Sequence, residues 1–201
     1  MAIQMPTSLS ETSACLALVR HGRSSHRHRG WIDSTGFRAW REAYEAAGLR
    51  DAERVPPDLA QLAAGATLVV ASDAPRAAES ARLLAAHREV TLSPLLRELD
   101  LEGPDLRGLR LPLAGWALAV GARTLLLTLR SGYPPPSERA RVVEAAGWLS
   151  SLTVHHPFVV AVTHASFRRQ LAIELVRAGW QPHSSKRPLH PWSAWLFSPS
   201  R

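Results

Sequence analysis

Short apolar runs that stop abruptly at polar or charged residues are the feature that most constrains this chain. Leu16–Val19 is followed at once by Arg20-His21-Gly22, a pattern typical of a buried strand that leads into a tight turn. Such runs are too short for helices and too apolar for a sheet with one wet face. The same pattern predicts further strands at residues 67–71, 90–92, 158–162 and 192–197.

Helical patterns separate these runs. Phe37, Trp40, Tyr44 and Ala47 recur at helical spacing, and Gly48 stands where such a helix would stop. A helix from about Pro75 to His87 is predicted, with Ser72 or Asp73 as its N-cap. Other helices are expected at about 57–62, 137–150 and 165–175. Strands that alternate with helices imply an α/β fold with a largely parallel sheet.

The length of 201 residues suits one domain, which we place at residues 14–201 after a polar, frayed tail at 1–13. The formal net charge of +7 comes almost entirely from arginine, because Lys186 is the only lysine. An anionic partner fits this charge. We expect no nucleic-acid partner, because the chain shows no basic helix or aromatic stacking motif.

The sequence also bears on location. Cys15 is the only cysteine, so no intrachain disulfide can form, which fits a reducing compartment and a buried, inert thiol. The most apolar stretch, Leu111–Leu129, contains Arg123, and its uncharged part is too short to span a bilayer. With no secretory signal at the start, we expect a cytoplasmic protein without a membrane partner.

The polar residues that follow the strands form one chemical set. Strand 16–19 leads to Arg20-His21, strand 67–71 to Ser72-Asp73 and Arg76, strand 90–92 to Arg97-Glu98, and strand 158–162 to Thr163-His164. Parallel strands bring these residues to one crevice. Guanidinium groups match phosphate oxygens, neutral imidazole attacks phosphorus, and a carboxylic acid protonates the departing oxygen. The set predicts phosphoryl transfer through a phosphohistidine, without a metal.

A family resemblance accompanies this set. Leu18-Val-Arg-His-Gly22 resembles the signature of the histidine phosphatase superfamily, which includes cofactor-dependent phosphoglycerate mutase and many small bacterial-type phosphatases. Val70–Ala77, Leu96–Leu99 and Val160–His164 resemble that family's second phosphate element, acid segment and second histidine block. The resemblance covers about residues 15–171 and implies a phosphoglycerate mutase-like three-layer α/β/α sandwich with a mostly parallel central sheet.

The resemblance also implies roles for single residues. His21 would be the phosphorylated nucleophile, and Glu98 the general acid and then the general base. No cofactor and no metal are implied. The residues expected to hold the phosphoryl oxygens are Arg20, Arg76, His164 and, through its hydroxyl, Ser24.

The chain departs from the family pattern after Glu98, where Leu101–Gly108 replaces an aromatic and glycine-rich block. Glu102, Asp105 and Asp73 therefore stay open as alternative acids. Ala165-Ser166 stand where many members carry Gly-Gly, and Arg27 where an Asn often follows the first histidine. These changes leave the phosphate grip intact and the substrate open.

The loop after His21 allows two interpretations. Arg23, Arg27 and Arg29 are either solvated residues or a rim that attracts the rest of an anionic substrate. His26 and His28 alternate as metal ligands do, but no third ligand is near in sequence, so we predict no metal there.

The predicted function is hydrolysis of a phosphomonoester by a metal-independent phosphatase acting on a phosphorylated small molecule or a phosphoprotein. Two alternatives stay open: a phosphomutase or phosphotransferase that uses the same phosphohistidine, and a non-catalytic module that binds phosphorylated ligands. The 103–136 insertion, with Trp116, is expected to form a packed helical cap or to line the substrate entrance.

Overall fold

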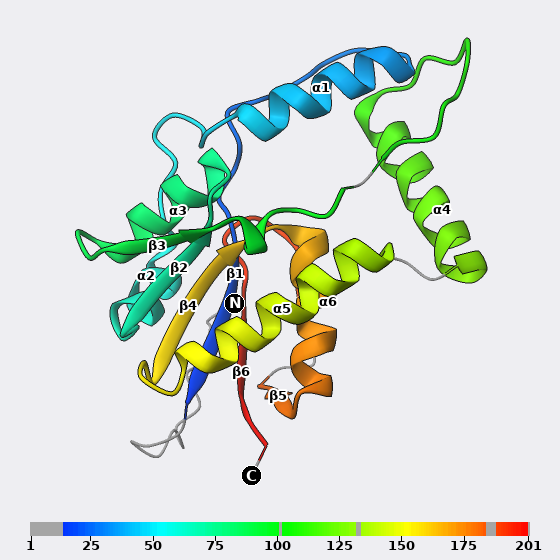
Figure 1. The fold of residues 1–201 in the computed structure, drawn as a ribbon. Coiled ribbons are helices and arrows are strands. Elements are labelled where there is room, and N and C mark those ends of the chain that lie inside the picture. The colour runs from blue at the N-terminus through cyan, green and yellow to red at the C-terminus, as the bar shows by residue number, and fades with distance from the viewer. Residues whose placement is uncertain (1–13, 101, 132–133, 184–187, 201) are drawn as a thin grey trace.

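The computed structural model describes residues 14–100, 102–131, 134–183 and 188–200, so the predicted tail at 1–13 lies outside the described residues. A six-stranded sheet has the strand order β3-β2-β4-β1-β6-β5 (Figure 1). Its parallel part comprises β1 (Cys15–Arg20), β2 (Leu68–Ser72), β3 (Val90–Ser93) and β4 (Phe158–Thr163). β6 (Ala194–Pro199) pairs antiparallel with β1, and β5 (Trp180–Pro182) pairs antiparallel with β6. The mostly parallel sheet is as predicted.

Helices cover both faces of the sheet, which gives the expected three layers (Figure 1). Side chains alternate along a strand, so Ala17 and Val19 face one core while Leu16 and Leu18 face the other. The first core is closed by α2 (Pro57–Ala64) and α3 (Pro75–Ala85). The second is closed by α5 (Pro136–Leu152), α6 (Ala165–Arg177) and the short 3₁₀ turn η1 (Pro94–Leu96).

Two further helices, α1 (Ser34–Ala46) and α4 (Leu113–Ser131), lie apart from these layers (Figure 1). Trp116 joins them. Its fully buried indole stacks on Phe37 with ring centroids 4.7 Å apart, and its N–H donates to the Ile32 carbonyl at 2.9 Å. A backbone bridge between Ile32 and Leu111 adds to this contact. Trp116 therefore packs inside a helical cap, one of the two roles expected for it.

Helix α4 is unusually apolar for its exposure. Its stretch Leu113–Arg130 has a mean hydropathy of 1.2, long and apolar enough by length and composition to cross a membrane, and 6% of it is buried. Length and composition of a single helix are weak evidence for a membrane span. The expected lack of a membrane span therefore stays a prediction. One side of α4 lines the cleft described below.

Two local predictions are wrong. The N-cap of α3 is Ala74, and no side chain caps this helix. The Ser72 hydroxyl does accept from the Ala74 N–H at 3.2 Å, but Asp73 pairs with Arg97 at 2.6 Å instead of capping. Pro75 at the start of the helix has no N–H that needs a partner.

The second error concerns the end of the chain. The last strand begins at Ala194, whereas Trp192 precedes it with a left-handed φ of 63°. Strand β5 was not predicted, because three residues show no periodicity. The expectation for Cys15 is confirmed: its thiol is buried, and burial raises its pKa to about 11.

Candidate active site

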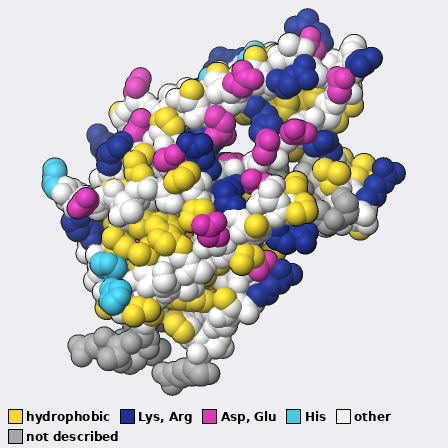
Figure 2. Space-filling model, in the orientation of Figure 1, with side chains coloured by type: hydrophobic (Ala, Val, Ile, Leu, Met, Phe, Trp, Pro, Cys, Tyr) yellow, Lys and Arg dark blue, Asp and Glu magenta, His cyan; other side chains and the backbone are white. Residues whose placement is uncertain are grey.

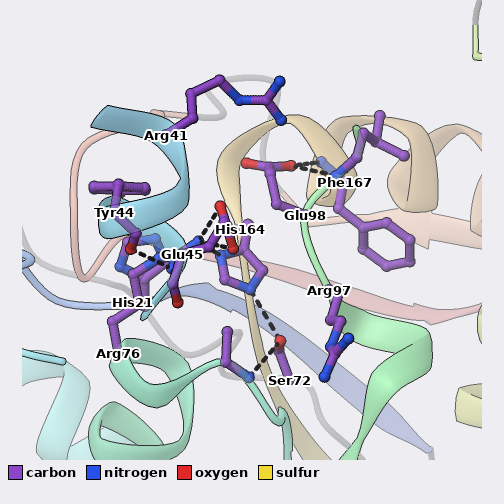
Figure 3. A network of polar contacts seen from close by, with 12 residues as sticks. His21, Arg41, Tyr44, Glu45, Ser72, Arg76, Arg97, Glu98, His164 and Phe167 are labelled. Carbon is purple, nitrogen blue, oxygen red and sulfur yellow. Dashed lines mark hydrogen bonds and ion pairs between the residues drawn. The ribbon is translucent and has the colours of Figure 1, made fainter. Parts of the chain in front are cut away.

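The two histidines predicted to converge lie side by side at the carboxyl edge of the sheet (Figure 3). His21 follows β1 and His164 follows β4, and these strands pair in register up to Arg20 and Thr163. The backbone N–H of His21 donates to the Thr163 carbonyl at 3.0 Å. Both rings are buried, and their centroids are 5.0 Å apart. Parallel pairing of β1 with β4 is therefore what brings the two imidazoles together.

The His21 ring is held in one tautomer. Its Nδ1 lies 2.7 Å from the Gly22 carbonyl oxygen. A carbonyl oxygen only accepts, so Nδ1 carries the hydrogen and Nε2 keeps its lone pair. Burial, and next the charge of Arg76, lower the pKa of His21 to about 3. The ring is therefore neutral, with a nucleophilic Nε2, at physiological pH.

The turn after His21 requires glycine. A Cβ on Gly22 would lie 2.5 Å from the Trp192 ring. The Gly22 N–H donates to the Ser80 hydroxyl at 2.9 Å, and that hydroxyl donates to the Arg76 carbonyl at 2.6 Å. These bonds tie the His21 turn to α3. Ser80 was not among the predicted site residues, although its place one helical turn after Arg76 could have indicated it.

Arg76 and His164 also meet as predicted. The fully buried guanidinium Nη2 lies 3.2 Å from His164 Nδ1, so that nitrogen accepts. His164 Nε2 then carries the hydrogen and donates to the Ser72 hydroxyl at 3.0 Å. Burial, and next His21 and Arg76, lower the pKa of His164, which keeps this ring neutral as well. Ser72 thus orients His164, a role that the sequence analysis did not assign.

The other partners of Arg76 come from α1. The Glu45 carboxylate oxygens lie 3.0 and 3.1 Å from Nη2, and Nη1 donates to the carbonyls of Tyr44 and Glu45 at 3.0 and 3.3 Å. The guanidinium carbon also lies 4.4 Å from the centre of the Tyr44 ring. The arginine predicted to bind phosphate therefore holds the last turn of α1, and a carboxylate occupies one of its donors. Nothing in the sequence predicted this role for Glu45.

Glu98 follows η1 in the chain, and its carboxylate lies at the first turn of α6, which begins directly after His164. Its carboxylate accepts from the Phe167 N–H at 2.7 Å, from Leu99 at 3.1 Å and from Ser166 at 3.3 Å. Burial nevertheless raises the pKa of Glu98, and the three backbone donors only partly offset it. A carboxyl group with a raised pKa retains its proton closer to neutral pH, as a general acid must.

The alternative acids are engaged elsewhere. Asp73 pairs with Arg97, Glu102 with Arg123 and Asp105 with Arg107. Of the four carboxylates considered from sequence, only Glu98 lines the cleft between α1, α4 and α6. The structure therefore favours Glu98 among them.

Two predicted phosphate contacts involve residues that have other partners here. Arg20 Nη1 donates to the Leu189 carbonyl, and the Ser24 hydroxyl accepts from the His26 N–H at 3.2 Å. Their contacts with phosphate stay predictions. Arg27 and Arg29 are exposed and do not line the cleft.

Arg168 is a buried residue that the sequence analysis missed. Its guanidinium donates to the carbonyls of Leu18 at 3.3 Å, Ser193 at 2.5 Å and Pro188 at 2.9 Å. It also lies 4.0 Å from the centre of the Trp195 ring, and burial lowers its pKa to about 9. Arg168 thus fastens the first turn of α6 to β1 and to the segment before β6, and so sets the position of the strand that carries His21.

Metal-ligating side chains do not cluster in the described part of the chain, where no group of three or more His, Cys, Asp or Glu could hold an ion. The His26 ring packs against Trp40, with ring centroids 5.8 Å apart.

A family model for the histidine phosphatase superfamily, branch 1, matches residues 16–192. The chain belongs to the histidine phosphatase superfamily. No curated protein sequence matches it.

Solved structures show the same fold at low sequence identity. A mycobacterial glucosyl-3-phosphoglycerate phosphatase in complex with VO3 has a TM-score of 0.57 and 19% identity, over 91% of this chain and 90% of that chain. The product of an open reading frame of Mycobacterium tuberculosis has a TM-score of 0.53 and 20% identity, with coverages of 91% and 90%. A phosphoserine phosphatase of Entamoeba histolytica has a TM-score of 0.51 and 18% identity, with coverages of 82% and 80%. At these identities the likeness establishes the fold.

Proposed function

We propose that this superfamily member is a phosphatase that hydrolyses a phosphomonoester through a phosphohistidine on His21. The observation that carries the proposal is the buried, neutral imidazole of His21, whose Nε2 keeps its lone pair. Its ring centroid lies 5.0 Å from that of His164, which is bound to Arg76. The solved phosphatases with this fold support the same reaction class.

The proposed first step is in-line transfer to the ring. The Nε2 lone pair of His21 attacks phosphorus, and the bond from phosphorus to the alcohol oxygen breaks. The proton on Glu98 passes to that oxygen, and the alcohol leaves. The positive charge that develops on the ring is stabilised by the Gly22 carbonyl that accepts from Nδ1. The Arg76 guanidinium, which His164 and Glu45 hold in place, stabilises the transferring oxygens.

The proposed second step regenerates the site. The Glu98 carboxylate takes a proton from water, the resulting hydroxide attacks phosphorus, and the bond to His21 Nε2 breaks. Inorganic phosphate leaves, and Glu98 is again protonated for the next cycle. The raised pKa of Glu98 suits it to give and take a proton in turn.

The test of the nucleophile is His21→Ala, with His155→Ala, at an exposed position before β4, as the matched control. We expect His21→Ala to lose activity at least about a thousandfold while its circular dichroism spectrum stays that of the parent. Rapid quenching with a ³²P-labelled ester is expected to trap an acid-labile phosphoenzyme in the parent and the control only. Full activity in His21→Ala would end this mechanism.

The test of the acid is Glu98→Gln. If Glu98 protonates the leaving oxygen, its loss slows alkyl phosphates, which are poor leaving groups, more than 4-nitrophenyl phosphate. An equal loss for both esters argues against the acid role. Analysis of the phosphoryl acceptor separates hydrolysis from transfer to a second hydroxyl, and phosphate binding without any turnover would instead indicate a binding module.

A further inference from the structure

A large cleft lies between α1, α4 and α6. Its volume is about 620 Å³, which is within the range of small-molecule sites. Figure 2 shows the surface hollowed beneath α1, with charged side chains around the rim. At its inner end stand Glu45, which contacts Arg76, and Glu98, which contacts the first turn of α6. The cleft therefore adjoins the two-histidine site through Glu45 and Glu98, and a phosphoryl group that reaches Arg76 past Glu45 would leave its alcohol inside the cleft.

The wall on α1 is a row of aromatic rings. Phe37 stacks on Trp40 with centroids 5.9 Å apart, and Trp40 stacks on Tyr44 at 5.3 Å. Trp116 extends the row on the other side of Phe37, at 4.7 Å. Because each ring stacks on the next, the wall is preorganised, and a ligand would have to immobilise few additional side chains when it binds.

The opposite wall on α4 is aliphatic. Leu113, Ala117, Val120 and Leu125 line it, and Gly121 leaves open space because nothing lies within 4 Å of its Cβ position. These side chains are partly or fully exposed to solvent. An apolar ligand would therefore remove apolar surface from water on both walls.

Several polar groups of the lining are already engaged. Arg41 pairs with Asp100 at 2.9 Å, and the Thr128 hydroxyl donates to the Thr124 carbonyl at 2.8 Å. The aliphatic side chains of α4 offer no hydrogen bonds, so a polyhydroxylated alcohol against this wall would lose hydration that the wall does not replace.

From this arrangement we infer that the cleft selects phosphomonoesters whose alcohol is bulky and apolar, either an aryl group or an alkyl chain. The inference rests on the proposed function, because it places the phosphoryl group at His21 and the alcohol between α1 and α4. Trp40 and Val120 are the specificity-determining residues, one from each wall.

The test is kcat/KM over a series of linear alkyl phosphates, from ethyl to octyl, whose leaving groups differ little in pKa. Each buried methylene group is worth up to about fourfold. Allowing for partial burial, we expect at least a thirtyfold rise from ethyl to octyl phosphate. The ratio of 2-naphthyl to phenyl phosphate measures the same effect for flat rings, so the two series show which alcohol the cleft prefers.

Two variants of α4 locate the effect. Val120→Asp places a carboxylate in the cleft and is expected to reduce the octyl-to-ethyl ratio at least tenfold. Leu118→Asp makes the same kind of change on a side chain that is 76% exposed and outside the cleft. It is expected to leave the ratio unchanged. An equal effect of both variants, or a parent ratio near one, overturns the inference.

The outcomes for the cleft and for the reaction are distinguishable. If ethyl and octyl phosphate are hydrolysed equally well, the phosphatase function stands and the cleft inference fails. If no ester is hydrolysed, the proposed function fails, and the cleft is then judged by calorimetry of the alkyl series on His21→Ala. Affinity that does not rise with chain length overturns the inference there too.

Discussion

Replacing Glu45 with glutamine tests whether this carboxylate competes with phosphate for Arg76. The Glu45 carboxylate lies 3.0 and 3.1 Å from Nη2 of the buried guanidinium. Glutamine keeps the shape and one acceptor but removes the charge. The backbone bonds from Arg76 to the carbonyls of Tyr44 and Glu45 remain, so α1 keeps its anchor.

The size of the effect follows from burial. A hydrogen bond between charged groups contributes about 1.5–3 kcal/mol, but the Glu45 side chain is 49% exposed and solvent screens it, so about 1 kcal/mol is a fair value for the lost pair. Repulsion between Glu45 and a phosphate on the same guanidinium adds up to about 1 kcal/mol in the same direction. We therefore expect phosphate to bind about fivefold to thirtyfold more tightly to Glu45→Gln.

The assay is competitive inhibition by inorganic phosphate against phenyl phosphate at low ionic strength. Glu42→Gln is the matched control, because it removes the same charge from an exposed position of α1 that forms no ion pair with any described residue. The inhibition constant of the control is expected to stay within about twofold of the parent value. An unchanged or weaker phosphate affinity in Glu45→Gln would refute the competition and would make Glu45 a residue that positions Arg76 for phosphate.

Two further predictions concern pH and stability. Because the pKa of His21 is lowered from 6.5 to about 3, activity is expected to persist as the pH falls from neutrality through 6.5, and because the pKa of Glu98 is raised, activity is expected to fall as rising pH deprotonates Glu98. A pH–rate profile that loses activity near pH 6.5 on the acid side would contradict a neutral His21. Arg168→Met would remove the buried side-chain hydrogen bonds to the carbonyls of Leu18, Ser193 and Pro188, and it is expected to lower stability by about 3 kcal/mol, a fall in Tm of about 6–12 °C that a thermal scan measures. A change below about 2 °C would show that Arg168 does not hold β1.

Local chemistry determined much of this protein. The strands before His21 and His164 were predictable because buried strands are short, continuous apolar runs. Their parallel pairing followed from the helices between them, and it brought Arg76 to His164 and the His164 ring to that of His21. The neutral state of the histidines was predictable in part: burial, which only the structure shows, lowers their pKa most, and the neighbouring arginines visible in the sequence lower it further.

Contacts between distant or inserted segments needed the tertiary structure. Glu45 lies 31 residues before Arg76, on a helix whose docking depends on Trp116 of the 103–136 insertion, and no periodicity encodes that contact. In the sequence, Arg168 looks like an ordinary surface residue of a helix, because its partner Leu18 lies 150 residues away. Residue spacing reports which face of a helix or strand is apolar, whereas packing alone decides which donor meets which acceptor across the core.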